Sequence, residues 1–447
     1  MVLGLENRYY SRVTKLATPV IIANAGQAVV YLADNIMVGQ LGVTPLASVA
    51  FAGMIILNLM VLGNGMAISL TPLVGENYVN RGYRYCSKLL QNSLVLNTLI
   101  GLFIAGTLLF IKPFLSYLGQ PQDIIDAGES YYIIVALSII PNMIFLSFKQ
   151  FMDGIGNTKM TMNITIACNV LNIFLNYIFI YGKFGCPAWG IFGAGLATFI
   201  SRLLMPIIYY ITLRRHTLYS KFFKFFSRDN SSLSTKRNLL VLGMPIAWQM
   251  VVEVGALSVT TIMFGWISIA TIAAGQVVMS IIQVLFLIVN GISGATTILT
   301  SHEYGRRNRR EIVKYTKASI YITVALMVSM GAIMILFREN LASVFSSDPE
   351  VIAIASSMII VVSIMELFDG LQVTTLGALR GIKEVHKPMK YAMISYILVS
   401  LPMSYIGGFV LNVGASGIWI GFLSGLTVAF ILFINRFYKI IKTTKFM

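Results

Sequence analysis

Twelve apolar segments, each of about 20 residues or more, run through almost the whole chain. An α-helix needs about 20 apolar residues to cross the hydrocarbon core of a bilayer. Only 11% of the residues are charged, whereas soluble domains have about 25%, so a soluble form would expose large apolar patches. The sequence therefore predicts an all-α polytopic membrane protein with about twelve transmembrane helices. The predicted spans lie near residues 14–38, 46–71, 89–111, 130–151, 160–181, 189–213, 238–265, 268–298, 314–337, 351–376, 389–411 and 416–436.

The chain carries a formal net charge of +16, and the placement of that charge indicates the orientation. Basic residues gather in every second loop, whereas the other loops hold little more than Lys112, Lys183 and Arg338. Because cytoplasmic loops carry the excess of Lys and Arg, we expect both termini in the cytoplasm and the spans in the plasma membrane (the inner membrane of a bacterium). The short clusters form no continuous basic domain, so we expect no nucleic-acid partner. The clusters span residues 8–15, 81–88, 214–237, 306–317, 380–390 and 436–445.

The chain repeats itself at an offset of about 226 residues. Such repeats are typical of transporters, and six spans per half make the two halves parallel, related by a pseudo-twofold axis along the membrane normal. We therefore expect an N-terminal six-helix bundle (1–213), a cytoplasmic linker (214–236), a C-terminal six-helix bundle (237–447) and a central cavity between the bundles. The repeated pairs include Pro19 with Pro245, Asn64-Gly65 with Asn290-Gly291, Tyr78 with Tyr304, Gly154 with Gly381 and Gly190 with Gly417.

Four carboxylates lie well inside the predicted spans: Asp34, Glu253, Glu366 and Asp369. A charge at this depth costs at least about 2.5 kcal/mol, so such residues are usually functional. Glu366 and Asp369 are three positions apart and share one helix face, and Glu253 in the same half could meet them. Two nearby carboxylates share a proton or hold a cation, so Glu253 and Asp369 are candidate Na⁺ ligands. The alternative is that each acid pairs structurally or reaches water at a helix end.

Amide and proline residues add two further expectations. Asn172 and Asn176 lie four positions apart on one face of the fifth span, where their amides could hydrogen-bond Asp34. Interhelical hydrogen bonding in lipid would explain the same pattern without a function.

Pro19 and Pro245 interrupt the first and seventh spans at matching positions of the two halves. These prolines favour a hinge or kink in each span, although packing alone would also tolerate them.

Several motifs resemble those of one family across essentially the whole chain. The segment Asp34-Asn-Ile-Met37-Val-Gly39 is similar to a D-x-x-M-x-G signature. The segment from Pro187 to Thr198 resembles the pattern P-x-x-G-x-x-G-A-x-x-A-T. With the paired loop motifs Gly154-Ile-Gly-Asn-Thr158 and Ala378-Leu-Arg-Gly381, the chain resembles the multidrug and toxic compound extrusion (MATE) transporters, nearest their NorM-type branch.

This resemblance implies a secondary active antiporter that exports cationic amphiphilic compounds in exchange for Na⁺ or H⁺. It implies an N-terminal coupling site at Asp34, Asn172 and Asn176, and a C-terminal cation site at Glu253 and Asp369. No cofactor besides the coupling ion is expected; the partners would be membrane lipid and the small cationic or amphiphilic substrates of a monomer. One position departs from the pattern: Met365 stands one turn before Asp369, where some NorM-type members carry a tyrosine.

Three other functions compete with this interpretation. A major-facilitator transporter also has two six-span halves, but the segment 75–84 matches its loop motif with the acidic spacing off by one. A flippase for lipid-linked oligosaccharides would need several cationic residues in its cavity, and only Arg202 lies deep in a predicted span. A membrane enzyme is disfavoured because the chain has no H-E-x-x-H or G-x-S-x-G motif. We therefore predict a transporter and not an enzyme.

Overall fold

The computed structural model describes residues 6–227 and 230–443. Arg228 and Asp229, in the middle of the predicted linker, and residues 444–447, beyond the last helix, lie outside the described residues. Twelve helices in the described ranges are long and apolar enough to cross a membrane, and each overlaps one predicted span. The prediction of an all-α polytopic protein with about twelve transmembrane helices is therefore confirmed.

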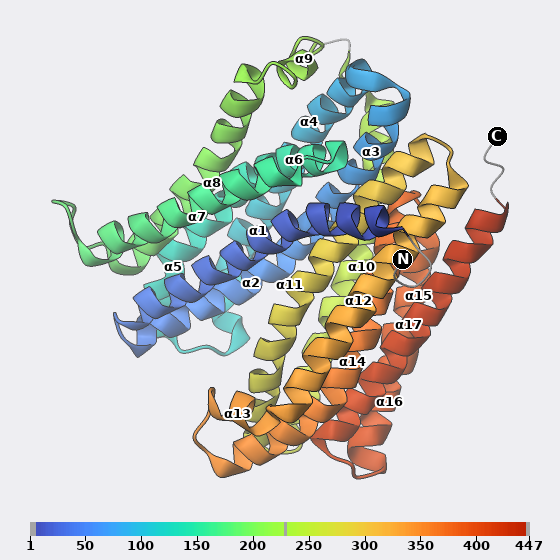
Figure 1. Ribbon diagram of the computed structural model, residues 1–447. Coiled ribbons are helices and arrows are strands. Elements are labelled where there is room, and N and C mark those ends of the chain that lie inside the picture. Colours follow the sequence, from blue (N-terminus) through green and yellow to red (C-terminus); the bar gives the residue numbers. More distant parts are fainter. Residues whose placement is uncertain (1–5, 228–229, 444–447) are drawn as a thin grey trace. The chain divides into compact units, whose positions relative to one another are not determined.

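The helices are, in chain order, α1 (Asn7–Gly39), α2 (Val43–Ile68), α3 (Leu70–Asn80), α4 (Gly82–Ile111), η1 (Lys112–Leu118), α5 (Gln122–Leu137), α6 (Ile139–Ile155), α7 (Thr158–Tyr181), α8 (Gly190–Arg215), α9 (Ser220–Phe223), α10 (Leu233–Gly265), α11 (Ile269–Gly305), α12 (Arg309–Leu336), α13 (Arg338–Ser343), α14 (Pro349–Gly381), α15 (His386–Met393), η3 (Ile394–Ser400), α16 (Leu401–Tyr405), η4 (Ile406–Val410) and α17 (Ala415–Thr443). Figure 1 shows them coloured along the sequence.

The described residues form two compact units. The N-terminal unit is Ile22–Ala247, and the C-terminal unit consists of residues 6–21 and 248–443. Two helices are shared: α1 begins in the C-terminal unit and passes into the N-terminal unit after Ile21, and α10 passes back after Ala247. The first turns of α1 therefore belong to the unit that is otherwise built from the second half of the chain.

Both units use the same contact at corresponding positions of the repeat. In the N-terminal unit, Thr71 Oγ1 donates a hydrogen bond to the carbonyl of Gln150, at 3.0 Å. In the C-terminal unit, Thr297 Oγ1, 226 positions later, donates to the carbonyl of Gly377, at 2.9 Å. One turn further on, a Cβ at Gly154 would lie 2.9 Å from the Thr71 carbonyl oxygen, and one at Gly381 would lie 2.8 Å from that of Thr297. Only glycine permits this close helix approach, so the internal repeat is visible in the packing of each unit.

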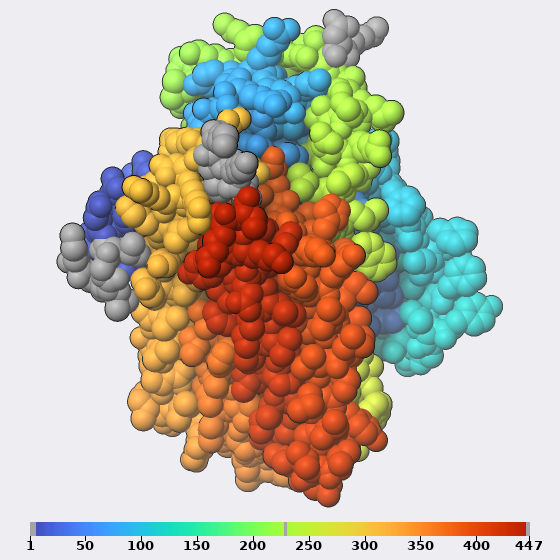
Figure 2. All heavy atoms as spheres, turned by 90° about the vertical axis from the view of Figure 1, so that its right-hand side faces the viewer, coloured from blue at the N-terminus to red at the C-terminus, as the bar shows by residue number. Residues whose placement is uncertain are grey.

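In the C-terminal unit, α14 is the central helix. It packs against α11, α12 and α17, which run beside it in Figure 1. In Figure 2 the side chains of α17 (red) pack closely against the orange helices of the same unit. Because α14 is enclosed in this way, Glu366 and Asp369 on it are only 1% and 8% exposed.

In the N-terminal unit, α7 packs against α8 and α6. The side chain of Asn157 caps the start of α7 by accepting a hydrogen bond from the backbone N–H of Met160, at 3.1 Å. This cap sets the residue at which α7 begins. The buried face of α7 is unusually polar. Its buried residues include Thr161, Thr165, Asn169, Asn172 and Asn176.

The eleventh span contains two wide turns on either side of Pro402. The segments η3 and η4 have π-helical hydrogen bonding and flank the short helix α16. Proline has no N–H to donate within a helix, and π-turns redirect the remaining backbone bonds. The span therefore stays helical from His386 to Val410 despite the proline.

Candidate functional site

The N-terminal unit holds a carboxylate–amide cluster around Asp34. Asn176 Nδ2 donates a hydrogen bond to Asp34 Oδ1 and lies 3.3 Å from Asn172 Oδ1. Both asparagines are almost fully buried: Asn172 is 4% exposed and Asn176 is 0% exposed. Asp34, in contrast, is partly exposed. The structure thus brings together the three residues that the sequence suggested for this half.

Arg202 on α8 adds a positive charge to this cluster. It interacts electrostatically with Asp34 and with Tyr131 on α5, and it donates a hydrogen bond to Ser138 Oγ, at 2.8 Å. A fixed guanidinium beside a carboxylate disfavours a bound metal ion there through charge repulsion. The guanidinium also disfavours a bound proton, but a proton needs only one carboxylate oxygen, whereas a metal ion needs several oxygen ligands.

The C-terminal unit holds a second, larger cluster around Asp369. Gln372 Nε2 donates to Asp369 Oδ1, at 3.2 Å, and to the hydroxyl of Tyr396, at 3.0 Å. Tyr396 in turn hydrogen-bonds Glu253 on α10, which interacts electrostatically with Asp369. Two carboxylates from different helices are therefore linked through one amide and one phenol. Tyr396 supplies a phenolic hydroxyl to this cluster, whereas Met365, one turn before Asp369, offers none.

Glu366 and Arg380 extend the second cluster along α14. Glu366 interacts electrostatically with Asp369, yet neither of its buried oxygens has a hydrogen-bond partner in the part of the chain that the structure describes. Arg380 interacts with Glu253 and donates a hydrogen bond to Gln249 Oε1, at 3.2 Å. Arg380 thus balances Glu253, one of the three acids, so the cluster can accept at least one more positive charge.

Oxygen atoms dominate the second cluster. Oxygen is the ligand type that a hard cation such as Na⁺ prefers. Glu366 Oε1 and Oε2 and Gln372 Oε1 are buried without partners, so they could serve as ligands beside Glu253 and Asp369. Among the described residues, no three His, Cys, Asp or Glu side chains converge as a metal site. A cation here would therefore need the amide and phenol oxygens as well as carboxylates.

The two predicted hinge residues lie at the points where the chain passes between units. Pro19 lies two residues before Ile21, the last residue of α1 within the C-terminal unit. Pro245 lies two residues before Ala247, the last residue of α10 within the N-terminal unit. Both helices continue through their proline, and their function as hinges stays a prediction.

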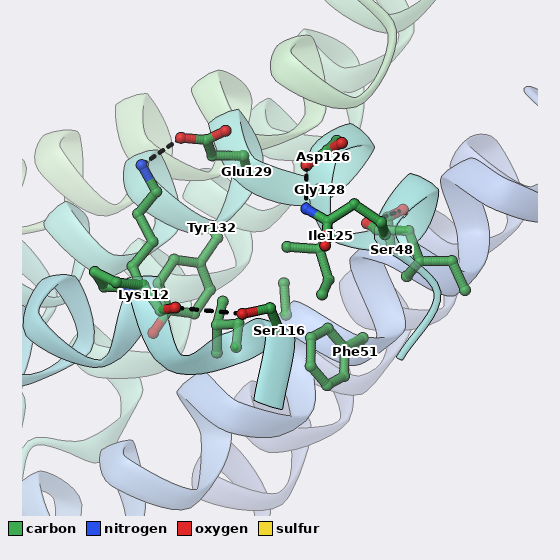
Figure 3. A pocket seen from close by; sticks show the side chains of 14 residues that line it. Ser48, Phe51, Lys112, Ser116, Ile125, Asp126, Gly128, Glu129 and Tyr132 are labelled. Atoms are coloured by element: carbon green, nitrogen blue, oxygen red, sulfur yellow. Dashed lines mark hydrogen bonds and ion pairs between the residues drawn. The ribbon is translucent and has the colours of Figure 1, made fainter. Parts of the chain in front are cut away.

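A cavity of about 190 Å³ opens in the N-terminal unit between α2, η1 and α5 (Figure 3). Its lining includes an ion pair between Lys112 and Glu129 and a hydrogen bond from Gln122 Nε2 to Asp126 Oδ1, at 2.8 Å. Asp34 and its asparagine partners do not line it. The cavity is therefore separate from the carboxylate cluster of this unit.

Sequence reasoning missed several members of both clusters. Gln372 and Tyr396 are common residue types in apolar spans, and only the packing of α14 against η3 and its neighbours reveals them. Arg202 was visible as the one basic residue deep in a span, which was a usable signal. Asp153 was also missed: it is buried at 7% exposed, but it stands directly before the Gly154 motif and there resembles a loop residue.

Comparisons with known proteins agree with this architecture. The family model MatE matches residues 19–178 and 245–406, one segment in each half of the chain. A probable multidrug resistance protein NorM from Bacillus subtilis is 28% identical over 429 residues, covering 96% of this chain and 94% of the relative. The multidrug resistance protein NorM of Vibrio cholerae is also 28% identical, covering 96% and 95%.

Solved structures share the fold. The Vibrio cholerae MATE transporter VcmN superposes with a TM-score of 0.90 at 18% identity, covering 98% of both chains. A transporter of the MOP superfamily from Pyrococcus furiosus gives 0.88 at 21% identity, covering 98% of this chain and 97% of the other. The prediction of a transporter and not an enzyme is confirmed by these relatives, and the family match covers well over half of the sequence. The protein belongs to the MatE family of membrane transporters.

Proposed function

We propose that the protein is a secondary active multidrug antiporter, which exports cationic amphiphilic compounds in exchange for H⁺ or Na⁺ by alternating access. The names of its NorM relatives, which describe multidrug resistance, support the substrate class. The observation that carries the coupling is the presence, in each unit, of acidic side chains held among polar side chains within the predicted spans, where binding of an ion would remove the cost of a buried charge. Asp34 has two amides and one arginine near it, and Glu366 has two buried oxygens without partners.

The two clusters suit different ions. We assign a proton to Asp34, because a single carboxylate beside Arg202 can be neutralised by a proton without the several oxygen ligands that a metal ion requires. We assign Na⁺ or a second proton to Glu253, Asp369 and Glu366, where unpaired oxygens are abundant. Neither assignment requires a cofactor.

Coupling follows from the cost of burying charge. An ionised carboxylate at membrane depth is costly, so binding of the coupling ion favours the conformation in which the cluster is closed to water. A cationic substrate competes with the ion for the same acids, so the two ligands bind alternately. An ion gradient can then drive substrate export, provided that the two ligands bind the two conformations with different affinities.

The membrane location, topology and oligomeric state that we propose are those expected from the sequence. The protein would lie in the bacterial inner membrane with both termini in the cytoplasm, as the distribution of Lys and Arg favours. We propose that it acts as a monomer in contact with membrane lipid, without nucleic acid. The prolines at 19 and 245 would absorb the change of shape where α1 and α10 pass between units.

Reconstituted efflux tests this proposal. Purified protein in liposomes should move a fluorescent organic cation when a pH gradient or a Na⁺ gradient is imposed separately. Asp34→Asn and Asp369→Asn should each lose gradient-driven transport of this cation. Asp126→Asn, which changes an exposed acid of the N-terminal unit, is the matched control and should transport normally. Wild-type rates in both Asp34→Asn and Asp369→Asn would refute the proposal.

A further inference from the structure

A line of polar side chains runs along the buried face of α7. Its members follow one another every three or four residues, so they lie on one side of the helix. Each is at most 7% exposed. The first and last members are 15 positions apart in the sequence, which corresponds to about 22 Å along the helix at 1.5 Å per residue. In order, its members are Thr161, Thr165, Asn169, Asn172 and Asn176.

A carboxylate lies at each end of this line. At one end, Asn176 donates to Asp34. At the other end, Thr161 Oγ1 donates to Asp153 Oδ1 on α6, at 3.1 Å. The charged and titratable groups beside Asp153 are Lys149 on α6 and Tyr209 on α8. Because the loop after the fourth span is expected in the cytoplasm, Asp153 lies at the cytoplasmic end of the line and Asp34 lies toward the other side.

Several polar atoms on α7 and on the adjacent helix α8 are buried without a hydrogen-bond partner among the described residues. They are Thr165 Oγ1, Asn169 Nδ2 and Asn176 Oδ1 on α7, and Ser201 Oγ on α8. An unpaired buried polar atom costs about 1–3 kcal/mol, and proteins commonly meet such atoms with ordered water. Four residues of helix advance about 6 Å, which is close to the span of two hydrogen bonds through one water molecule.

The backbone of α1 approaches the middle of the line closely. A Cβ at Gly26 would lie 3.1 Å from Asn169 Nδ2, so the glycine lets this amide lie against the backbone of α1. Among the described residues Asn169 Nδ2 has no hydrogen-bond partner, and one ordered water molecule would satisfy it.

We propose that the buried polar face of α7 holds a file of water molecules that carries protons between Asp34 and Asp153. This file, from Asn176 to Thr161, is called the α7 file below, and it rests on the proposed proton coupling at Asp34. A proton leaves the Asp34 carboxyl group, each water accepts one proton and donates another, and the last proton bonds to the Asp153 carboxylate. Charge and atoms balance, because Asp34 becomes ionised as Asp153 becomes neutral.

A permanently connected file would dissipate the proton gradient, so it must be interrupted during the cycle. The break falls at the contact between Asn176 and Asp34, because Asp34 is the member that lies on α1. Asp34 and α7 both belong to the N-terminal unit, whereas the first turns of α1 belong to the C-terminal unit; a bend in α1 between these parts would separate Asp34 from Asn176. Arg202 beside Asp34 repels a free hydronium ion, as fixed cations do in other pores, so protons must pass through the carboxylate.

The test measures proton movement and substrate binding separately. Protein in liposomes that contain a pH-sensitive dye is given a gradient of a fluorescent organic cation, and the affinity for that cation is measured in detergent. Thr165→Val and Asp153→Asn should slow proton movement about tenfold, the rate equivalent of one lost hydrogen bond, with unchanged affinity. Thr316→Val is the matched control, since Thr316 is equally buried and its hydroxyl bonds the Ile312 carbonyl in its own helix.

Two comparisons decide between explanations. Thr165→Ser keeps the hydroxyl group but lacks the methyl group, so it should show the wild-type rate of proton movement. A rate as slow as that of Thr165→Val would mean that packing of the methyl group, not water, determines the rate. That result would refute the proposed water file. Normal proton movement in both Thr165→Val and Asp153→Asn, with Asp34→Asn inactive, would refute the proposed water file but not the proposed function. Normal coupling in Asp34→Asn would instead refute the proposed function.

Discussion

Replacing Asn176 with leucine should tighten proton binding at Asp34. The amide of Asn176 donates a hydrogen bond to the Asp34 carboxylate, which stabilises the ionised form relative to the protonated one. A hydrogen bond to a charged group contributes about 1.5–3 kcal/mol, and 1.36 kcal/mol corresponds to a factor of ten. The proton should therefore bind about 10- to 150-fold more tightly in the variant.

Equilibrium binding of a fluorescent organic cation across a pH series measures this change. If protons compete with the cation, half-maximal displacement in Asn176→Leu should occur at a proton concentration lower by that factor. Asn97→Leu is the control, because Asn97 is also buried in the N-terminal unit and its Nδ2 donates to Ser147 Oγ, at 2.7 Å, rather than to a carboxylate. Displacement at the wild-type or a higher proton concentration in folded Asn176→Leu would refute this reasoning.

Three further outcomes follow from the packing of the C-terminal unit. Gly381→Ala should lower the free energy of unfolding by about 1–3 kcal/mol, because its Cβ would lie 1.8 Å from Thr300 Oγ1; adding Thr300→Ala should recover part of this loss in thermal unfolding, and no recovery would contradict the steric cause. Glu366→Gln should fold normally yet lose Na⁺-dependent thermal stabilisation, whereas unchanged stabilisation would exclude Glu366 from the cation site. Tyr9→Phe removes the hydrogen bond to Glu311, at 2.7 Å, and should increase hydrogen exchange in the first turns of α1; unchanged exchange would show that this bond does not hold the helix start.

Hydropathy was sufficient to predict the twelve spans, because lipid imposes a length and a composition on every crossing. It underestimated helix lengths. The eighth span was expected to end near residue 298, but α11 continues to Gly305, and α12 begins at Arg309 although its span was expected from about residue 314. The charged turns at these ends remain helical after leaving the apolar layer, and a hydropathy pattern does not report them.

The candidate site was only partly accessible to sequence reasoning. Asp34 and its two asparagines were found because acids are rare in spans and because amides four positions apart share a helix face. Gln372 and Tyr396 could not be found in this way, since their importance depends on which helices pack against α14. Asp153 was missed because its position beside Gly154 gives no sign that Thr161 and Tyr209 enclose it.

The central claim is that substrate export and ion movement are obligatorily linked through Asp34. The most direct test is to load liposomes with a substrate gradient and no ion gradient, and to record lumenal pH. The account predicts that substrate flowing down its gradient moves protons in the opposite direction, and that Asp34→Asn abolishes this counterflow. Substrate flow through the wild-type protein without any proton counterflow would contradict it.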